Sequence, residues 1–409
     1  MKFKHNWKKG KKREMLSYED KPIEEYERDE NKEKKSLFSN NKIRNVVIIL
    51  AVLVIAVGLH SVWKNISPAS LQDSISSVQA KGNGFPVKIE GKSVDESDTG
   101  ILSGNFAYIS DTQFQILNNN GGLVSNKRVK FASPAMTSCN KYALIYDREG
   151  SGYRIESSSG TIYEGEADDD IFDAEILDNG CYAILSKKSG YSTKLTVYNS
   201  DNTQKYAYYF SQCYATDVSL DKDVKHAVVC GLDASEGSMV SRIYILDFTK
   251  EEPIEKIEFK DSTIYSVDFL NNGNISAIGN KSAMIITSDY KNKYDFTYNG
   301  YNLASINVVD DGVFISLSPF TDGKSCEIWH ITQNGFTTVT KTELSTTSMD
   351  VMGKTVALLS NNTITLFDTS TQTSLKSYDA GIDAKSIRYT NSNTIYVVGT
   401  TEIRAVSLK

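Results

Sequence analysis

The sequence is poor in the residues that most catalytic and metal-binding sites require. Its 409 residues include only 3 tryptophans, 4 histidines, 5 cysteines and 6 prolines. Two of the histidines, His5 and His60, fall in the N-terminal region, so a Ser–His–acid arrangement is poorly supplied. A P-loop, a GxGxxG fingerprint and a GxSxG nucleophile elbow are also absent. We therefore expect no enzyme, no catalytic residues and no cofactor.

The cysteines do not form a recognisable framework either. They are odd in number and no pair has CxxC spacing, so a set of disulfides is not implied. The one local group of soft metal ligands is Cys213, His226 and Cys230, in which His226 and Cys230 lie four apart on one strand face. Structural zinc uses four protein ligands and catalytic zinc three. We interpret these residues as buried packing residues and predict no metal.

Most of the chain carries no net positive charge. Residues 1–44 hold 14 Lys/Arg and 9 Asp/Glu, while the rest holds 31 and 42, a net charge of −11. Nucleic-acid-binding proteins usually carry a basic surface, so no nucleic-acid partner is expected. A basic N-terminal tail before an acidic domain is typical of a membrane protein whose N-terminus is cytoplasmic.

One long apolar run follows that tail. Residues 46–59, VVIILAVLVIAVGL, contain no polar side chain, and extension to Ile43 and Trp63 gives about the 20 residues that cross a bilayer. The run is apolar all round, which argues against a buried amphipathic helix. A cleaved signal peptide is the other alternative, but more than 40 residues precede the run. We predict a disordered cytoplasmic tail (1–42), an uncleaved transmembrane helix (43–63) that contacts the lipid bilayer, and a Ser-rich stalk (64–84).

The remaining residues, 85–409, contain an internal sequence repeat. A phrase led by a small or apolar residue recurs eight times at spacings of 36 to 50 residues, about 41 on average. An alternating strand and a turn precede the phrase, with Asn-Gly or Asp-Gly in segments 173–180, 266–273 and 305–312, and two further strands follow it. Four strands at this period predict an all-β propeller. The phrases begin at Ala107, Ala143, Ala183, Ala227, Ala277, Val313, Ala357 and Tyr396.

The blade count follows from the ends of the domain. The last repeat ends after three strands at Lys409, and residues 85–92, FPVKIEGK, have no blade of their own. This segment could supply the missing fourth strand and close the ring, which removes exposed sheet edges. Eight blades result, with seven as the alternative because the interval from Ala227 to Ala277 is long. The alanines of the phrases would let neighbouring sheets approach closely.

This layout resembles a bacterial, mainly Firmicutes, family of membrane-anchored propellers whose domain has no known function. The Lys-rich head, the single apolar run, the Phe85-Pro86-Val87 entry and the Ala-led phrases carry the resemblance. The resemblance implies a membrane-anchored propeller, and the predicted cytoplasmic N-terminus places that propeller on the outer side of the plasma membrane. The chain is more distantly similar to WD40-like and quinoprotein-like propellers, but it lacks a recurrent Gly-His…Trp-Asp signature and Trp-docking repeats. Quinone chemistry is therefore not implied.

Three polar segments are candidates for ligand contact. Asp217, Ser219, Asp221 and Asp223 resemble the start of a calcium loop, but the Gly and Glu that an EF-hand requires are replaced by Lys222 and Val228. We interpret this segment as a turn between two strands. Residues 164–170, with five acidic side chains, are predicted to form a solvated loop between blades. The segment KYAYYF (205–210) is interpreted as strand packing, although tyrosines can also stack on sugars.

The favoured hypothesis is a tethered binding or scaffolding module for a protein or a cell-envelope ligand. The alternative is a hydrolase or lyase of cell-wall polysaccharide whose carboxylates converge only in three dimensions. A third hypothesis gives the tail a signalling role. The sequence assigns the ligand-binding role to no individual residue.

Overall fold

The computed structural model describes residues 80–409 except residues 93, 234–239, 260–261 and 322. The predicted tail, the predicted transmembrane helix and residues 64–79 of the predicted stalk lie outside the described residues. Within the described ranges, no helix is long and apolar enough to cross a bilayer. Their one helical element is a 3₁₀ turn, η2 (Glu96–Asp98), which the strand pattern of the sequence does not predict.

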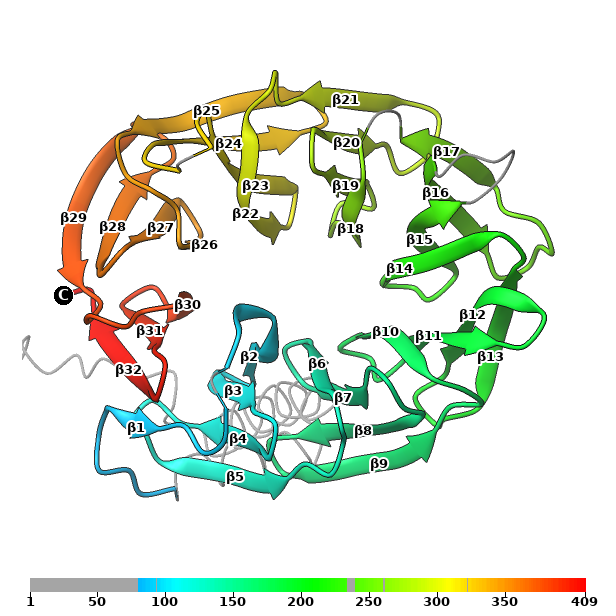
Figure 1. The fold of residues 1–409 in the computed structure, drawn as a ribbon, viewed down its shortest axis with the longest axis horizontal. Helices are drawn as coiled ribbons and strands as arrows, with labels where there is room; N and C mark the ends of the chain where they lie inside the picture. Colours follow the sequence, from blue (N-terminus) through cyan, green and yellow to red (C-terminus); the bar gives the residue numbers. More distant parts are fainter. Residues whose placement is uncertain (1–79, 93, 234–239, 260–261, 322) are drawn as a thin grey trace, which may run out of the picture. The chain divides into compact units, whose positions relative to one another are not determined.

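The described strands form eight antiparallel sheets of four strands, arranged as blades around a common centre (Figure 1). The predicted eight-bladed propeller is thereby confirmed, and the seven-bladed alternative is wrong. Within each blade the strands follow chain order from the centre outwards, except that blade 8 takes its outermost strand from the start of the domain.

Blades 1 to 4 carry the first half of the repeats. Their strands are β2 (Thr99–Leu102), β3 (Asn105–Ile109), β4 (Gln113–Leu117) and β5 (Leu123–Arg128); β6 (Pro134–Ser138), β7 (Ala143–Asp147), β8 (Gly152–Ser157) and β9 (Gly160–Glu166); β10 (Ile171–Ile176), β11 (Tyr182–Lys188), β12 (Tyr191–Tyr198) and β13 (Gln204–Phe210); β14 (Cys213–Leu220), β15 (His226–Asp233), β16 (Val240–Asp247) and β17 (Glu255–Phe259).

Blades 5 to 8 complete the ring. Their strands are β18 (Ile264–Phe269), β19 (Ile275–Gly279), β20 (Ser282–Ile286) and β21 (Lys293–Thr297); β22 (Asn302–Val309), β23 (Gly312–Ser318), β24 (Cys326–Thr332) and β25 (Gly335–Thr342); β26 (Ser348–Met352), β27 (Thr355–Ser360), β28 (Thr363–Asp368) and β29 (Thr373–Asp379); β30 (Ser386–Asn391), β31 (Thr394–Val398), β32 (Glu402–Ser407) and β1 (Val87–Lys88).

The ring closes through β1. Val87 pairs with Ile403 of β32, so residues from the start of the domain complete the blade formed by its last three strands. The ordered strand is shorter than the segment 85–92. Next to it, Tyr396 lies fully buried, with its ring 4.9 Å from that of Phe85 and 5.0 Å from that of Phe106. Aromatic packing and backbone pairing therefore join blade 8 to blade 1.

The residues that lead the eight repeated phrases share their strand and their burial, although some face the next blade and others the preceding one. Each lies on the second strand of its blade, and each is 0% exposed. Six of the eight are alanines, which add almost no thickness where two blades approach near the centre. The packing interpretation of the alanines agrees with this burial.

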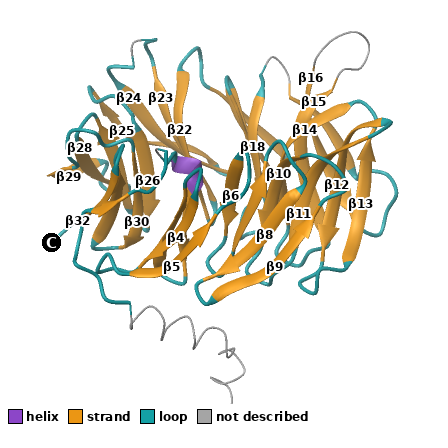
Figure 2. Ribbon diagram, turned by 60° about the horizontal axis from the view of Figure 1, so that its bottom comes forward, coloured by secondary structure: helices purple, strands orange, loops and turns teal. Residues whose placement is uncertain are grey.

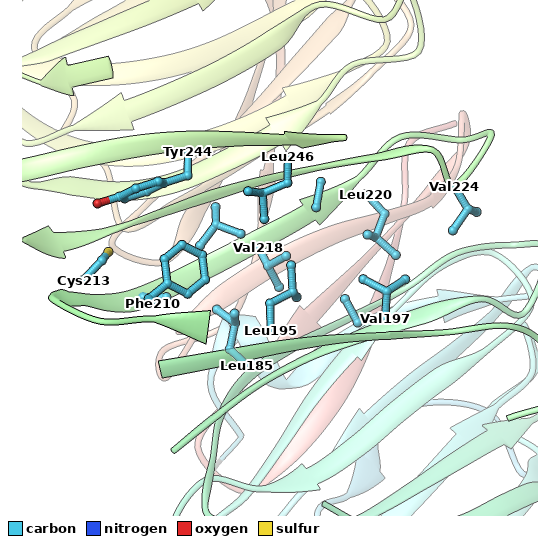
Figure 3. Packing of buried hydrophobic residues seen from close by; sticks show 14 residues of the cluster. Leu185, Leu195, Val197, Phe210, Cys213, Val218, Leu220, Val224, Tyr244 and Leu246 are labelled. Atoms are coloured by element: carbon cyan, nitrogen blue, oxygen red, sulfur yellow. The ribbon is translucent and has the colours of Figure 1, made fainter. Parts of the chain in front are cut away.

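A separate hydrophobic cluster fills each of the eight interfaces between neighbouring blades. Figure 3 shows the one between blades 3 and 4, where Leu195, Phe210 and Val218 lie between the two sheets. The ring of Phe210 meets that of Tyr244 edge-on at 5.2 Å between centroids. Burial of apolar side chains on both faces of the inner strands thus holds the blades together.

The outermost strands differ from the inner ones, because they border solvent. Figure 2 shows the ring obliquely, with the strands of each blade side by side. All five residues of the second strand β19 are buried, whereas six of the seven residues of the outermost strand β29 are exposed. Candidate ligand contacts therefore lie along the blade edges, in the loops and at the ends of the inner strands.

Candidate functional site

The cysteines and histidine singled out from the sequence do not converge. Cys213 faces the cluster between blades 3 and 4, while Cys230 faces the cluster between blades 4 and 5. His226 is the first residue of β15, whereas Cys213 lies beside the last residue of that strand. The His226 side chain contacts Asp221, with 3.2 Å between Nδ1 and Oδ2. Across the described ranges, no group of three or more His, Cys, Asp or Glu side chains is placed to hold a metal ion. All five cysteines are free thiols.

The segment that resembles a calcium loop is split between two environments. Asp221 lies in the turn that joins β14 to β15, where its Oδ1 accepts hydrogen bonds from the backbone N–H groups of Lys225 (2.6 Å) and His226 (2.9 Å). Asp217 and Ser219, in contrast, lie on β14 itself. The prediction of a turn is right for Asp221 and Asp223 and wrong for the other two, because strand β14 extends to Leu220.

The acidic run at 164–170 is likewise divided. Glu164 and Glu166 belong to the outermost strand β9, which corrects the prediction that the whole run is a loop. Asp168 lies in the connection to blade 3, where Lys194 (2.9 Å) and Lys188 (3.5 Å) neutralise it. These contacts give the run a role in joining blades 2 and 3.

The tyrosine-rich segment forms the outermost strand β13. The ring of Tyr206 stacks on Phe248 of blade 4 at 4.7 Å between centroids, and the ring of Tyr209 lies 5.0 Å from that of Tyr191. The predicted strand packing is present, and a cavity of about 500 Å³ lies beside these tyrosines.

Carboxylates do converge at one place, on the inner strands of blades 3 to 5. Asp173 and Glu175 lie on β10, Asp217 on β14 and Asp268 on β18, three strands that are neighbours around the centre of the ring (Figure 1). A polar side chain at alternate positions of each inner strand produces this row. The sequence hides it, because each residue taken alone belongs to an ordinary alternating strand.

Hydrogen bonds give this carboxylate row a structural use. Asp217 Oδ2 accepts a hydrogen bond from the backbone N–H of Val267 in blade 5 (2.7 Å). Ser219 donates its hydroxyl to Glu175 (3.0 Å) and accepts the N–H of Phe269 (3.1 Å). The innermost strands of blades 4 and 5 carry N–H groups at their free edges that need acceptors, and side chains of the preceding blade accept from several of them.

Burial dominates the electrostatics of the carboxylate row. It raises the pKa of Asp173 and of Asp268 to about 6 and that of Glu175 to about 8. Burial also raises the pKa of Asp217 well above its usual range, and the charge of Asp173 adds to the effect. Asp268 Oδ2 has no hydrogen-bond partner in the part of the chain that the structure describes. A proton held within the row relieves the repulsion between the carboxylates.

A second candidate site is a cavity of about 680 Å³ between blades 5 and 6. It opens at the end of the ring where the inner strands begin, beside the turn at 279–282 and the connection at 298–302. Tyr265 on β18 lines it. The pairing of β18 with β19 skips Tyr265, and such a bulge turns a side chain out of the regular alternation. Tyr265 is 54% exposed in consequence.

The rim of this cavity is built from a tight turn. Asn299 and Gly300 both have positive φ, +53° and +88°, and the N–H of Tyr301 donates to the carbonyl of Tyr298 (3.0 Å). Asn-Gly favours this turn because both residues tolerate positive φ at low cost. Tyr298 points the other way, into the core between the two blades, where its hydroxyl has no partner among the described residues.

The lining of the cavity combines aromatic rings with carboxamides. Tyr265 and Tyr301 contribute rings, and Asn280, Asn299 and Asn302 contribute amides. Asp295 and Lys281 add one charge of each sign. A volume of this size suits a small ligand or one segment of a polymer. No signal in the sequence identified these residues, because the cavity forms only when the two blades pack together.

The fold defines the class of protein, which is an eight-bladed β-propeller. The designed protein Ika8 superimposes with a TM-score of 0.60 at 11% identity, over 78% of this chain and 98% of its own. The C-terminal WD40 domain of Sif2 gives a TM-score of 0.57 at 13% identity, over 80% and 99% respectively. At these identities the likeness concerns the fold alone.

The chain belongs to DUF5711, a family of unknown function whose model matches residues 83–408. The match begins just before the closing strand and covers the whole ring. No curated protein matches the chain.

Proposed function

We propose that this chain is a binding module, tethered to the plasma membrane by residues 43–63, whose propeller lies on the extracytoplasmic side. The cavity between blades 5 and 6 carries this proposal, since it joins two exposed or half-exposed tyrosine rings to polar groups on a rigid ring. Rigid propellers are typical interaction modules, and pre-formed cavities bind ligands without the cost of ordering a loop. The partner would be a protein or a cell-envelope polymer.

The topology of the proposal rests on charge and hydropathy. Fourteen Lys/Arg precede or adjoin the apolar run 46–59, which favours a cytoplasmic N-terminus. The acidic propeller is then exported, where a basic or neutral partner would meet it.

Site-specific photo-crosslinking in living cells tests the binding role. A photoreactive amino acid at Asn302, on the cavity rim, is expected to capture an envelope component. The same amino acid at Leu375, which is 54% exposed on the outermost strand of blade 7, serves as the control. Capture from Asn302 alone supports the proposal. Equal capture from both positions, or none from Asn302, contradicts it.

A second candidate function is a carboxylate-dependent hydrolase or lyase of cell-wall polysaccharide. The convergence of Asp173 and Asp217 favours it, because two carboxyl groups that share a proton can act as acid and base. Their hydrogen bonds to backbone groups of blade 4 and blade 5 favour the structural role instead. Polysaccharide cleavage by the full chain that is lost in Asp173→Asn would establish catalysis, and its absence in the wild-type chain would remove this candidate.

A further inference from the structure

We propose that the cavity between blades 5 and 6 binds a neutral carbohydrate chain, with one sugar ring stacked on Tyr265. This inference rests on the proposed binding function and names the class of ligand for the same site. It follows from the aromatic surface, the free amide groups and the balance of charge in the cavity.

The exposed ring of Tyr265 is the platform. A tyrosine that is 54% exposed at the start of an inner strand leaves much of its apolar surface in water. Across the part of the chain that the structure describes, no other aromatic ring packs on it. The flat C–H face of a pyranose fits such a ring, because it buries apolar surface while the hydroxyl groups at its edge remain free for hydrogen bonds.

The amides provide the hydrogen bonds at the edge of the sugar. Asn280 Oδ1 already accepts from the N–H of Thr263 (2.9 Å) and the hydroxyl of Ser262 (3.0 Å), which fixes the side chain. Its amide NH₂ group has no partner among the described residues and remains available as a donor. The exposed side chain of Asn302, which also makes no hydrogen bond to described residues, offers both a donor and an acceptor. Hydroxyl and acetamido groups match both kinds of partner.

Charge selects against other ligands. Asp295 and Lys281 cancel within the cavity, so it attracts neither an anionic polymer nor a basic peptide. An apolar peptide anchor would need a desolvated pocket, whereas this cavity is lined by three carboxamides as well as by its rings. An uncharged polymer rich in hydroxyl groups satisfies the lining with the fewest unpaired polar atoms.

Calorimetric titration of the full chain in detergent tests the inference, with chitotetraose and cellotetraose as probes. We expect binding of at least one of them, and a loss of affinity of tenfold or more in Tyr265→Ala. Tyr214→Ala is the matched control, because Tyr214 is also 54% exposed, near the start of the inner strand of blade 4, and does not line the cavity. Thermal unfolding of both variants checks that each remains folded.

The outcomes separate the inference from the proposed function. Binding of chitotetraose alone would show that the cavity recognises the sugar ring together with its acetamido group. Binding of both probes would show that the sugar ring is sufficient. Binding of neither probe, or equal losses in Tyr265→Ala and Tyr214→Ala, overturns the inference. In that case specific crosslinking from Asn302 would still leave the binding function standing with a protein partner, and its absence would remove both.

Discussion

The carboxylate of Glu175 in blade 3 accepts a hydrogen bond from the backbone N–H of Leu220 in blade 4 and another from the hydroxyl of Ser219. One side chain therefore pairs with a backbone N–H at the free edge of the neighbouring innermost strand. The same device recurs in blade 7, where Asp350 accepts the N–H of Tyr389 in blade 8 (2.6 Å). Polar side chains of the innermost strands thus link these neighbouring blades near the centre of the ring.

Glu175 should make the stability of the ring depend on pH. Burial raises its pKa from the usual 4.5 to about 8, so the folded chain holds this proton more tightly than the unfolded chain. The resulting stability is present in acid and is lost as the pH rises through about 8. Between pH 6 and pH 8.5 the wild-type chain should lose about 2 kcal/mol through this group.

Denaturant unfolding at the two pH values measures that loss. Glu175→Gln keeps an acceptor oxygen but does not titrate, so its pH dependence should be smaller by this amount. Glu258→Gln, on an exposed position of β17, should leave the pH dependence unchanged. An identical pH dependence in wild type and Glu175→Gln would show that the side chain ionises freely.

Ala183 should tolerate no larger side chain. It is fully buried between blades 3 and 4, so Ala183→Leu is expected to lower the free energy of unfolding by about 1–3 kcal/mol through overpacking. Ala132→Leu, at an exposed position between blades 1 and 2, is the control and should change it little. Thermal unfolding compares the two, and equal stabilities would refute the close-approach role of the alanines.

The closure of the ring should depend strongly on Tyr396. Tyr396→Ala removes the ring that packs on Phe85 and Phe106 and should cost about 3–5 kcal/mol. Tyr396→Phe removes only the hydroxyl, which donates to the carbonyl of Asn118 at 3.3 Å, and should cost about 1 kcal/mol. In limited proteolysis, the first cleavage of Tyr396→Ala should fall at the junction of blades 8 and 1. Cleavage elsewhere at the same rate would argue against a closure that limits stability.

The cysteines should differ in reactivity. Burial raises the pKa of the Cys139 and Cys213 thiols to about 12 and also raises the pKa of Cys230 and Cys326. At pH 8 these four should resist iodoacetamide in the native chain, because the thiolate is the reactive form. The half-buried Cys181 should be labelled first in the native chain, and all five cysteines should be labelled when the chain is unfolded in urea. Mass spectrometry of the labelled peptides measures the order in which the cysteines react. Rapid labelling of Cys213 or Cys230 in the native chain would contradict the packing of blade 4.

The fold could be predicted from the sequence because it is encoded locally and repeatedly. Alanines such as Ala183 and Ala277 recur with the blade, and turns such as Asn272–Gly273 mark the strand ends. The candidate sites could not be predicted in this way. The carboxylate row combines Asp173, Asp217 and Asp268 from three blades, and the cavity depends on a bulge that exposes Tyr265. Such features arise from register and from contacts between blades, which periodicity alone does not specify.

Protease shaving of intact cells, with one tag at residue 1 and another at residue 409, tests most directly the claim that a tethered propeller presents its binding face outside the membrane. The account predicts that only the C-terminal tag is lost, and that both tags are lost once the cells are broken. Loss of the N-terminal tag alone from intact cells would place the propeller inside and contradict the claim. A C-terminal tag recovered free in the medium would contradict the tether.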